Sequence, residues 1–400
     1  MKKKQAGFLL AAAVLFLSMG TGVAAEEARH YVTAAEENYT IDEELLDTLT
    51  AEEKKGYLDY MASNIVYDNL TSFDYEYVRN EFTPAFGMLY VTSDEESINS
   101  AADHLLEVMQ NMEPEGDPES KKIYLWDGEN IPTLSTDYTE NVDWLCHSAP
   151  DFQPYLLEML IPEDETPKGA VICVPGGDRG AAALNEAYET AVAFNELGYQ
   201  CFLVQNRQNN YPWSPKESGV DVARAIRYVR AHAEEYRISL DEIAVSGASN
   251  GGATCVSSLV YYGDRHSVSE YFPDYVPDEL DEISAVPDVF LALYPAVDIL
   301  NGYSEQRDED MEKVIDTVEE IPFPPTFLVI GEEDTDRLFE GALQIISACR
   351  SQEVPADLHV FEGAPHGFGG LGITTAGQVF ENTAVWTELA DTFMQNRYAS

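Results

Sequence analysis

The sequence has little positive charge. Its 400 residues include 23 Lys and Arg against 72 Asp and Glu, which gives a formal net charge of −49 at pH 7. Such a surface repels nucleic acid and anionic membranes and disfavours strongly anionic substrates, so neutral substrates fit better. Solubility outside the cell is the simplest reason for this acidity, and adaptation to salt is the alternative.

Cysteines are also few, and their number is odd. Of the five, Cys173 and Cys201 fall in predicted central strands, and Cys255 and Cys349 fall in predicted helices that face the core. We therefore expect mostly buried free thiols rather than a disulfide framework. The cysteine spacings match no zinc pattern, and we predict no metal and no cofactor.

No long apolar run follows the N-terminal segment, so nothing there approaches the roughly 20 apolar residues of a membrane-spanning helix. At the N-terminus, Lys2, Lys3 and Lys4 precede an apolar stretch of about 13 residues and then small residues ending at Ala25. This arrangement is typical of a secretory signal peptide. We expect cleavage near Ala25, a secreted mature protein that begins near Glu26, and no stable membrane anchor.

Three regions follow from this pattern: the signal peptide at 1–25, an acidic region at 26–120 and a larger region at 121–400. The acidic region is predicted to be helical. Its capping-box pairs are Thr40 with Glu43, Thr50 with Glu53, and Ser93 with Glu96.

In the region 121–400, strand patterns alternate with helical patterns, and no internal repeat is present. Strands are predicted at 155–161, 170–174, 199–204, 242–246, 289–294, 326–330 and 358–361. This alternation predicts an α/β fold whose central sheet is mostly parallel and covered by helices on both faces.

The most informative motif is Gly247-Ala248-Ser249-Asn250-Gly251, which lies between a predicted strand and a predicted helix start. A nucleophilic hydroxyl held at a sharp strand-to-helix turn needs small residues two positions before it and two after it. Gly247 and Gly251 meet that need. The motif therefore predicts a serine hydrolase with Ser249 as the nucleophile.

An acid and a base follow the serine along the chain. Asp334 comes just after the strand at 326–330, and His366 lies in a Gly/Pro loop after the strand at 358–361. The order serine, acid, histidine belongs to α/β-hydrolases. Because loops at the carboxyl ends of parallel strands meet at one edge of the sheet, we expect the three side chains to converge. The alternatives to Asp334 are its neighbours Asp336, Glu333 and Glu332.

A further feature is Gly176-Gly177 at the end of the apolar strand 170–174. Backbone N–H groups there, together with that of Asn250, are expected to form an oxyanion hole. Asp178 follows them, and a carboxylate beside an oxyanion would oppose it. Either Asp178 turns away and pairs with Arg179, or the loop takes another path and the donors shift by one residue.

With these motifs in place, the sequence resembles the acetyl xylan esterase-like branch of the α/β-hydrolase superfamily, close to the hormone-sensitive-lipase type. The resemblance extends from about Lys122 to about Tyr398. The segments that carry it are Leu125-Trp126-Asp127-Gly128, Pro175-Gly176-Gly177, residues 221–230, Tyr294-Pro295, Pro324-Pro325-Thr326-Phe327 and His366-Gly367-Phe368.

This resemblance implies the α/β-hydrolase fold and hydrolysis of a carboxylic ester, acetyl esters above all, through an acyl-enzyme with Ser249, Asp334 and His366 as the triad. Acetylated plant polysaccharide and small soluble esters fit it equally. Trp213, in Tyr211-Pro212-Trp213, and Phe368 are expected to bind substrate, with packed loop residues as the alternative. Because the base is a neutral imidazole, activity should rise from mildly acidic to neutral pH.

Two other functions share parts of this pattern. A prolyl-oligopeptidase-type serine peptidase has the same elbow and triad order, but it usually adds a propeller domain, for which the N-terminal region is too short. A non-catalytic hydrolase-like binding protein would account for Asp178, although loss of catalysis normally erodes the triad. The expected partner is a small-molecule or carbohydrate ester rather than nucleic acid, and the sequence does not indicate an oligomeric state.

Overall fold

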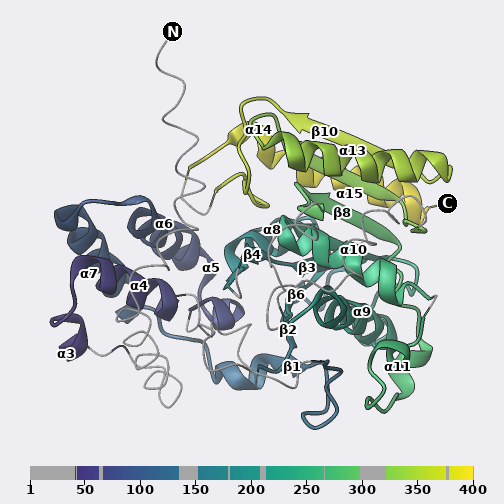
Figure 1. Cartoon of the computed structure of the whole chain (residues 1–400), viewed down its shortest axis with the longest axis horizontal. Coiled ribbons are helices and arrows are strands. Elements are labelled where there is room, and N and C mark those ends of the chain that lie inside the picture. Colours follow the sequence, from purple (N-terminus) through teal and green to yellow (C-terminus); the bar gives the residue numbers. More distant parts are fainter. Residues whose placement is uncertain are drawn as a thin grey trace.

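The protein is seen here in a computed structural model, which describes residues 41, 43–62, 66–134, 152–178, 181–207, 213–264, 266–297, 321–374 and 378–399. The expected signal peptide, Thr40, Cys146, Arg179, Tyr211 and Pro212 lie outside these residues. Figure 1 shows a group of helices from the N-terminal region beside a larger unit built around a sheet.

The N-terminal region is helical, as predicted. Its elements are α3 (Glu43–Leu46), α4 (Ala51–Met61), η3 (Tyr67–Ser72), α5 (Tyr75–Tyr77), η4 (Val78–Phe82), α6 (Thr83–Val91), α7 (Glu95–Gln110) and η5 (Pro118–Lys121).

Capping residues explain where two of these helices begin. Thr50 and Glu53 form the predicted capping box at α4. The predicted box of Ser93 with Glu96 is wrong, because Asp94 caps α7 by accepting a hydrogen bond from the Ser97 N–H at 3.0 Å. Aspartate is a strong N-cap residue, and it satisfies one of the N–H groups that the first turn leaves without a helical acceptor.

The central sheet has eight strands in the order β1-β2-β6-β3-β7-β8-β9-β10. They are β1 (Lys122–Tyr124), β2 (Tyr155–Met159), β3 (Ala170–Val174), β6 (Gln200–Gln205), β7 (Ile243–Ala248), β8 (Val289–Leu293), β9 (Thr326–Gly331) and β10 (Ala356–Phe361). The strands β1 and β2 run antiparallel to their neighbours and all the others are parallel. The predicted α/β class is confirmed, and the sequence patterns missed β1 and the small hairpin of β4 (Gly176–Asp178) and β5 (Ala181–Ala183).

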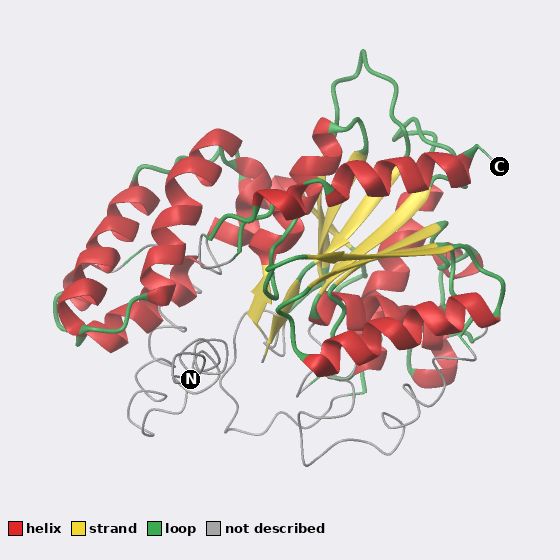
Figure 2. Ribbon diagram, turned by 90° about the horizontal axis from the view of Figure 1, so that it is seen from above, coloured by secondary structure: helices red, strands yellow, loops and turns green. Residues whose placement is uncertain are grey.

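The inner strands are mostly apolar because both faces of the sheet are covered. Every residue of β3, β6, β7, β8 and β9 is buried, whereas the edge strand β10 is largely exposed or half-buried. Figure 2 shows helices on both sides of the sheet.

The direction of each crossover places its helix. The helix α8 (Leu184–Glu196) leads from β3 to β6 on one side, and α9 (Pro215–Ala231) leads back from β6 to β7 on the other. Since such crossovers are right-handed, α8 and α9 lie on opposite faces. The helices α10 (Asn250–Tyr262) and α13 (Asp336–Ser351) belong to crossovers in the same direction as that of α9, so they share its face. The C-terminal helix α15 (Trp386–Tyr398) packs on α8.

Shorter helices complete this unit: α11 (Val268–Tyr271), η7 (Glu279–Glu282) and α14 (Glu381–Ala384). From β3 the chain moves to β6 on one side, and it then crosses back to β7 on the other side of β3. Ligands of such sheets bind beyond the carboxyl ends of the strands at this reversal. The strand order therefore predicts a site beyond the ends of β3 and β7.

The N-terminal helices pack against the α/β unit through α8. The ring of Tyr75 lies 6.1 Å from that of Tyr188, and apolar residues of both regions belong to one continuous buried cluster. In the part of the chain that the structure describes, Cys173, Cys201, Cys255 and Cys349 are free and buried, as predicted. No helix among the described residues has the length and apolar character needed to cross a membrane.

Candidate active site

Ser249 occupies a strained turn between β7 and α10. Its backbone has φ 50° and ψ −117°, in a region that side chains other than glycine rarely adopt. The Ser249 N–H donates to the carbonyl of Leu293 at the end of β8, at 2.9 Å. The neighbouring strand therefore helps to hold this turn, and strain of this kind is typical of a nucleophile elbow.

The glycines on either side of Ser249 are required by close contacts. A Cβ atom at Gly247 would lie 2.7 Å from the Gly251 carbonyl oxygen and 2.8 Å from Cys255 Sγ. A Cβ atom at Gly251 would lie 2.4 Å from the Pro175 carbonyl oxygen. All three distances are too short for any side chain, so α10 can begin this close to β3 only with glycine at both positions.

The structure brings Ser249, His366 and Asp334 into one hydrogen-bonded series. Nε2 of His366 lies 2.8 Å from Oγ of Ser249, and Nδ1 of His366 lies 2.9 Å from Oδ2 of Asp334. The Asp334 side chain is fully buried, while that of His366 is 37% exposed. The alternatives Glu332, Glu333 and Asp336 are exposed. Such a series can withdraw the serine proton and stabilise the resulting imidazolium.

Backbone hydrogen bonds between the loops after β9 and β10 place the acid beside the base. The N–H groups of Glu332 and Glu333 donate to the carbonyls of Phe361 and Ala364, at 2.8 and 2.9 Å. A Cβ atom at Gly331 would lie 2.2 Å from the Ala364 carbonyl oxygen. Glycine at the end of β9 therefore allows the histidine loop to approach the loop of Asp334.

The expected oxyanion residues lie against the nucleophile. A Cβ atom at Gly176 would be 3.2 Å from Cβ of Ser249, so the first residue of β4 passes directly beside the turn. Gly177 has φ 131°, and Asn250 is the first residue of α10, where the helix dipole favours negative charge. The backbone of Asp178 continues β4, whereas its side chain and Arg179 lie outside the described residues.

The two aromatic residues expected to bind substrate are buried. Phe368 has no exposed surface, and its ring packs against those of Tyr294 and Phe361 at 4.8 and 5.9 Å between centroids. Trp213 is 5% exposed, with the Arg207 guanidinium 5.2 Å from its ring centre. In this conformation Phe368 presents no surface to a ligand, because its ring fills the core beneath the histidine loop.

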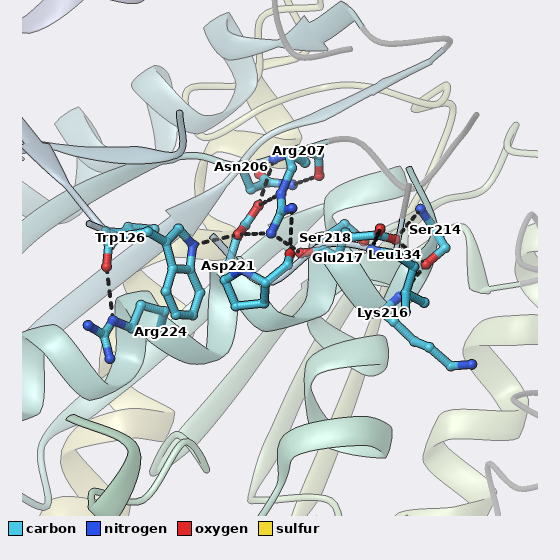
Figure 3. A network of polar contacts seen from close by, with 12 residues as sticks. Trp126, Leu134, Asn206, Arg207, Ser214, Lys216, Glu217, Ser218, Asp221 and Arg224 are labelled. Atoms are coloured by element: carbon cyan, nitrogen blue, oxygen red, sulfur yellow. Dashed lines mark hydrogen bonds and ion pairs between the residues drawn. The ribbon is translucent and has the colours of Figure 1, made fainter. Parts of the chain in front are cut away.

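Beyond the end of β6, Arg207 and Asp221 form an ion pair whose side chains are fully buried. Figure 3 shows Asp221 between Arg207 and Trp126, whose indole N–H donates to Oδ1 at 2.9 Å. Arg207 also donates to the carbonyls of Pro132 and Glu217. Burial acts to lower the pKa of Arg207, but the charge of Asp221 and its hydrogen bonds outweigh burial, and the pKa lies above its ordinary value.

This polar network extends to the N-terminus of α9. Glu217 of α9 accepts hydrogen bonds from the Leu134 N–H at 2.8 Å and from Ser214. The network thereby joins three segments that are distant in sequence: 126–134, the end of β6 and the start of α9 (Figure 3).

The sequence patterns did not single out Glu186 or Glu189 of α8. Both carboxyl groups are buried, at 4% and 5% exposure, and Glu186 lies beside Gly176 and Gly367. Acidic residues are so frequent in this chain that two more on a helix draw no notice. A detectable signal is their spacing of three, which puts both on one helical face, next to apolar positions.

No group of three or more His, Cys, Asp or Glu side chains is arranged to hold a metal ion within the described ranges.

Comparison with known proteins gives matches of limited extent. The BD-FAE family model matches residues 157–321, less than half of the chain. Endo-1,4-beta-xylanase B of Butyrivibrio fibrisolvens is 25% identical over 269 residues, which cover 63% of this chain and 40% of that protein. Acetylxylan esterase of Xylanibacter ruminicola is 24% identical over 213 residues, covering 51% of this chain and 42% of that protein. The chain thus matches less than half the length of these curated relatives.

A solved structure supports the fold directly. The crystal structure of an acetyl ester-xyloside bifunctional hydrolase from Caldicellulosiruptor lactoaceticus has a TM-score of 0.53 and 23% sequence identity to this chain. The superposition covers 69% of this chain and 95% of the other. Similarity at this level of identity establishes the shared fold, and it leaves the chemistry to be argued from the residues of the site.

Proposed function

We propose that this chain, which has the α/β-hydrolase fold, is a secreted serine carboxylesterase that hydrolyses short-chain esters, acetyl esters above all, through an acyl-enzyme on Ser249. The observation that carries the proposal is the hydrogen-bonded series from Ser249 Oγ through the His366 ring to Asp334, at 2.8 and 2.9 Å. It begins at a strained strand-to-helix turn, which is where hydrolases of this fold present their nucleophile.

In the acylation step, Nε2 of His366 takes the Ser249 proton as Oγ attacks the ester carbonyl carbon. Asp334 holds the Nδ1–H tautomer and stabilises the imidazolium. The carbonyl oxygen gains negative charge, which N–H groups of Gly176 or Gly177 and of Asn250 would stabilise. Each such donor accounts for a factor of about 10² to 10³ in rate in other hydrolases. The imidazolium then protonates the leaving alcohol as the carbon–oxygen bond breaks.

Deacylation repeats these steps with water as the nucleophile. His366 takes a proton from the water, hydroxide adds to the acyl carbon, and collapse of the second tetrahedral intermediate returns the proton to Ser249 Oγ. The carboxylic acid leaves and the free serine is restored.

Acetylated plant polysaccharide is the substrate class that we propose. Two proteins similar to this chain are named for xylan or xyloside chemistry together with acetyl esters: the Xylanibacter acetylxylan esterase and the Caldicellulosiruptor bifunctional hydrolase. The acidic net charge of −49 favours a neutral ester of this kind over an anionic one. The pattern of Lys2 to Lys4, an apolar stretch and small residues up to Ala25 supports secretion, where such polymers are found.

The decisive test is hydrolysis of p-nitrophenyl acetate, butyrate and octanoate by the protein beginning at Glu26, with Ser249→Ala as the matched variant. We expect kcat/KM to fall with acyl length and to drop at least about a thousandfold in Ser249→Ala, because the covalent intermediate cannot form. A fluorophosphonate should label the wild type and leave Ser249→Ala unlabelled.

Acetate release from acetylated xylan, with deacetylated xylan as the control, then tests the natural substrate. Turnover that persists in Ser249→Ala contradicts the serine mechanism. Cleavage of short proline-containing peptides without ester turnover would instead indicate a peptidase. Absence of both activities, with acetylated xylan still bound, would indicate a binding protein.

A further inference from the structure

A buried carboxylic acid lies where the oxyanion strand and the histidine loop meet. Glu186, in the first turn of α8, is 4% exposed. A Cβ atom at Gly176 would be 2.4 Å from its Oε2, and one at Gly367 would be 3.2 Å from its Oε1. One carboxyl group therefore touches both the strand that runs beside Ser249 and the residue that follows His366.

Tyr294 connects this carboxyl group to the rest of the histidine loop. Its hydroxyl donates to Oε1 of Glu186 at 3.2 Å and accepts from the Gly369 N–H at 3.1 Å. Its ring meets the His366 ring edge to face, with 4.8 Å between centroids. Tyr294 comes directly after β8 and has a strained φ of 35°. Its side chain therefore makes these contacts from a backbone conformation that residues other than glycine rarely adopt.

The burial of the Glu186 carboxyl group is only partly compensated, because the Tyr294 hydroxyl donates to Oε1 alone. Its Oε2 has no hydrogen-bond partner among the described residues, and neither does Oε2 of Glu189, one turn further along α8. An ionisable group in such a place destabilises the fold, and a native protein that keeps one usually does so for a functional reason.

We propose that Glu186 is a positioning residue of the triad: its carboxylate supplies a second negative charge, besides that of Asp334, toward the His366 imidazolium, and its contacts hold the oxyanion strand beside the histidine loop. This inference rests on the proposed function, in which the imidazolium forms as Ser249 attacks.

The charged and titratable groups around Glu186 support this coupling. Burial raises the pKa of Glu186, while His366, the Tyr294 hydroxyl and the Gly176 backbone act to lower it. Burial and the charge of Glu186 hold the pKa of Glu189 well above its usual range, with Arg79 acting in the opposite direction. Since the interaction between Glu186 and His366 is mutual, ionised Glu186 favours the protonated imidazole.

The primary test is an NMR titration of the His366 ring in the wild type and in Glu186→Gln, with His366→Gln used to assign the signal. Glutamine keeps the shape and an acceptor for Tyr294 but carries no charge. We expect the midpoint of the titration to fall by about half a pH unit or more in Glu186→Gln. Glu186→Asp, which keeps the charge, should restore most of the difference.

Glu189→Gln is the matched control, because Glu189 is as buried as Glu186 and lies against Gly369 instead of Gly367. It should not lower the midpoint. The pH profile of kcat/KM for p-nitrophenyl acetate gives a second reading: Glu186→Gln should move its acidic limb to lower pH and reduce kcat about tenfold. KM should change little, because the lost interaction belongs to the transition state.

An unchanged midpoint in Glu186→Gln overturns the proposal, as does an equal fall in Glu189→Gln. A loss of activity without a shift in the acidic limb of the pH profile also overturns it, because altered packing, and not the lost charge, would then explain the loss. If Glu186→Gln does not fold, as judged by circular dichroism, Glu186→Leu removes the charge without adding a buried donor. The titration needs no turnover, so a wild type without Ser249-dependent activity would refute the proposed function while the coupling is still measured.

Discussion

The two carboxylate oxygens of Asp334 have different partners. Oδ1 accepts from the Thr335 backbone N–H at 2.8 Å, and Oδ2 faces Nδ1 of His366 at 2.9 Å. Thr335 is also the N-cap of α13, so the start of this helix sets the orientation of the carboxylate. A single residue thus connects a helix terminus to the tautomer of the imidazole.

Asp334→Asn should leave the fold intact and lower kcat by about 10³ to 10⁴. The amide would use its oxygen for the Thr335 N–H and turn its NH₂ toward His366, so the imidazole would place its proton on Nε2, facing Ser249. Esterase assays and a thermal melt of both proteins measure the two effects. Asp336→Asn is the control, because Asp336 is exposed and near in sequence. If both variants lose activity equally, the role of Asp334 as the orienting acid is wrong.

Among the elements, β6, α9 and the segment 126–134 depend on one buried charge pair. Arg207 donates to Asp221 through Nε at 2.9 Å and Nη2 at 2.7 Å, and both side chains are excluded from solvent. Removal of one partner of such a pair leaves the other charged and buried.

Arg207→Met should therefore lower the free energy of unfolding by about 3 to 5 kcal/mol. Asp221 would keep only the Trp126 indole N–H and the backbone N–H of residue 207 as donors. Chemical denaturation monitored by tryptophan fluorescence measures the loss. Lys54→Met is the matched control: its partner Asp103 is 75% exposed at 4.0 Å, and an exposed pair contributes at most about 1 kcal/mol. Equal losses in the two variants would contradict the argument from burial.

For the whole molecule, acidity and burial act on stability in the same direction. The net charge of −49 makes the folded protein repel itself. Burial also raises the pKa of Glu186 and of Glu189. A carboxyl group with a raised pKa favours folding most at low pH, and that contribution is lost as pH rises through its folded value.

Other carboxyl groups make the folded protein less stable at strongly acidic pH. The hydrogen bond and charge of Arg224 lower the pKa of Asp278 in spite of partial burial, and the hydrogen bond from Tyr124 lowers that of Glu119. Their contribution is present above their unfolded pKa values and is lost as pH falls through the folded ones, in the strongly acidic range.

We therefore expect Tm to rise as pH falls from about 8 to about 5.5 and to decline below about 4. Differential scanning calorimetry over this range tests it. Glu189→Gln should flatten the pH dependence of the free energy of unfolding, by at most about 1.4 kcal/mol per pH unit, and that of Tm with it. Added sodium chloride should raise Tm more at pH 8 than at pH 5.5, because salt screens the surface charge. A Tm that does not vary between pH 8 and 5.5 would contradict the contribution of the buried carboxyl groups, and a Tm that does not respond to salt would contradict that of the surface charge.

Much of this molecule is determined by local sequence. The run of apolar residues at 326–330 specifies a strand buried on both faces, and Gly247 and Gly251 specify a turn that leaves no room for side chains. The α/β fold follows from the alternation of such strands with helices. These features can be predicted from the sequence because each depends on residues close together in the chain. The alternation of side chains along a strand, the helical period and backbone sterics are all local properties.

Which side chains meet depends on the tertiary packing. Glu186 looks like any other surface acid until α8 packs between β4 and the histidine loop, and Phe368 looks like a pocket residue until its ring is seen against Tyr294 and Phe361. Likewise, Arg207 and Asp221 become a buried pair only when β6 and α9 lie together. Burial and charge coupling depend on distances between segments far apart in sequence, and no local pattern contains those distances.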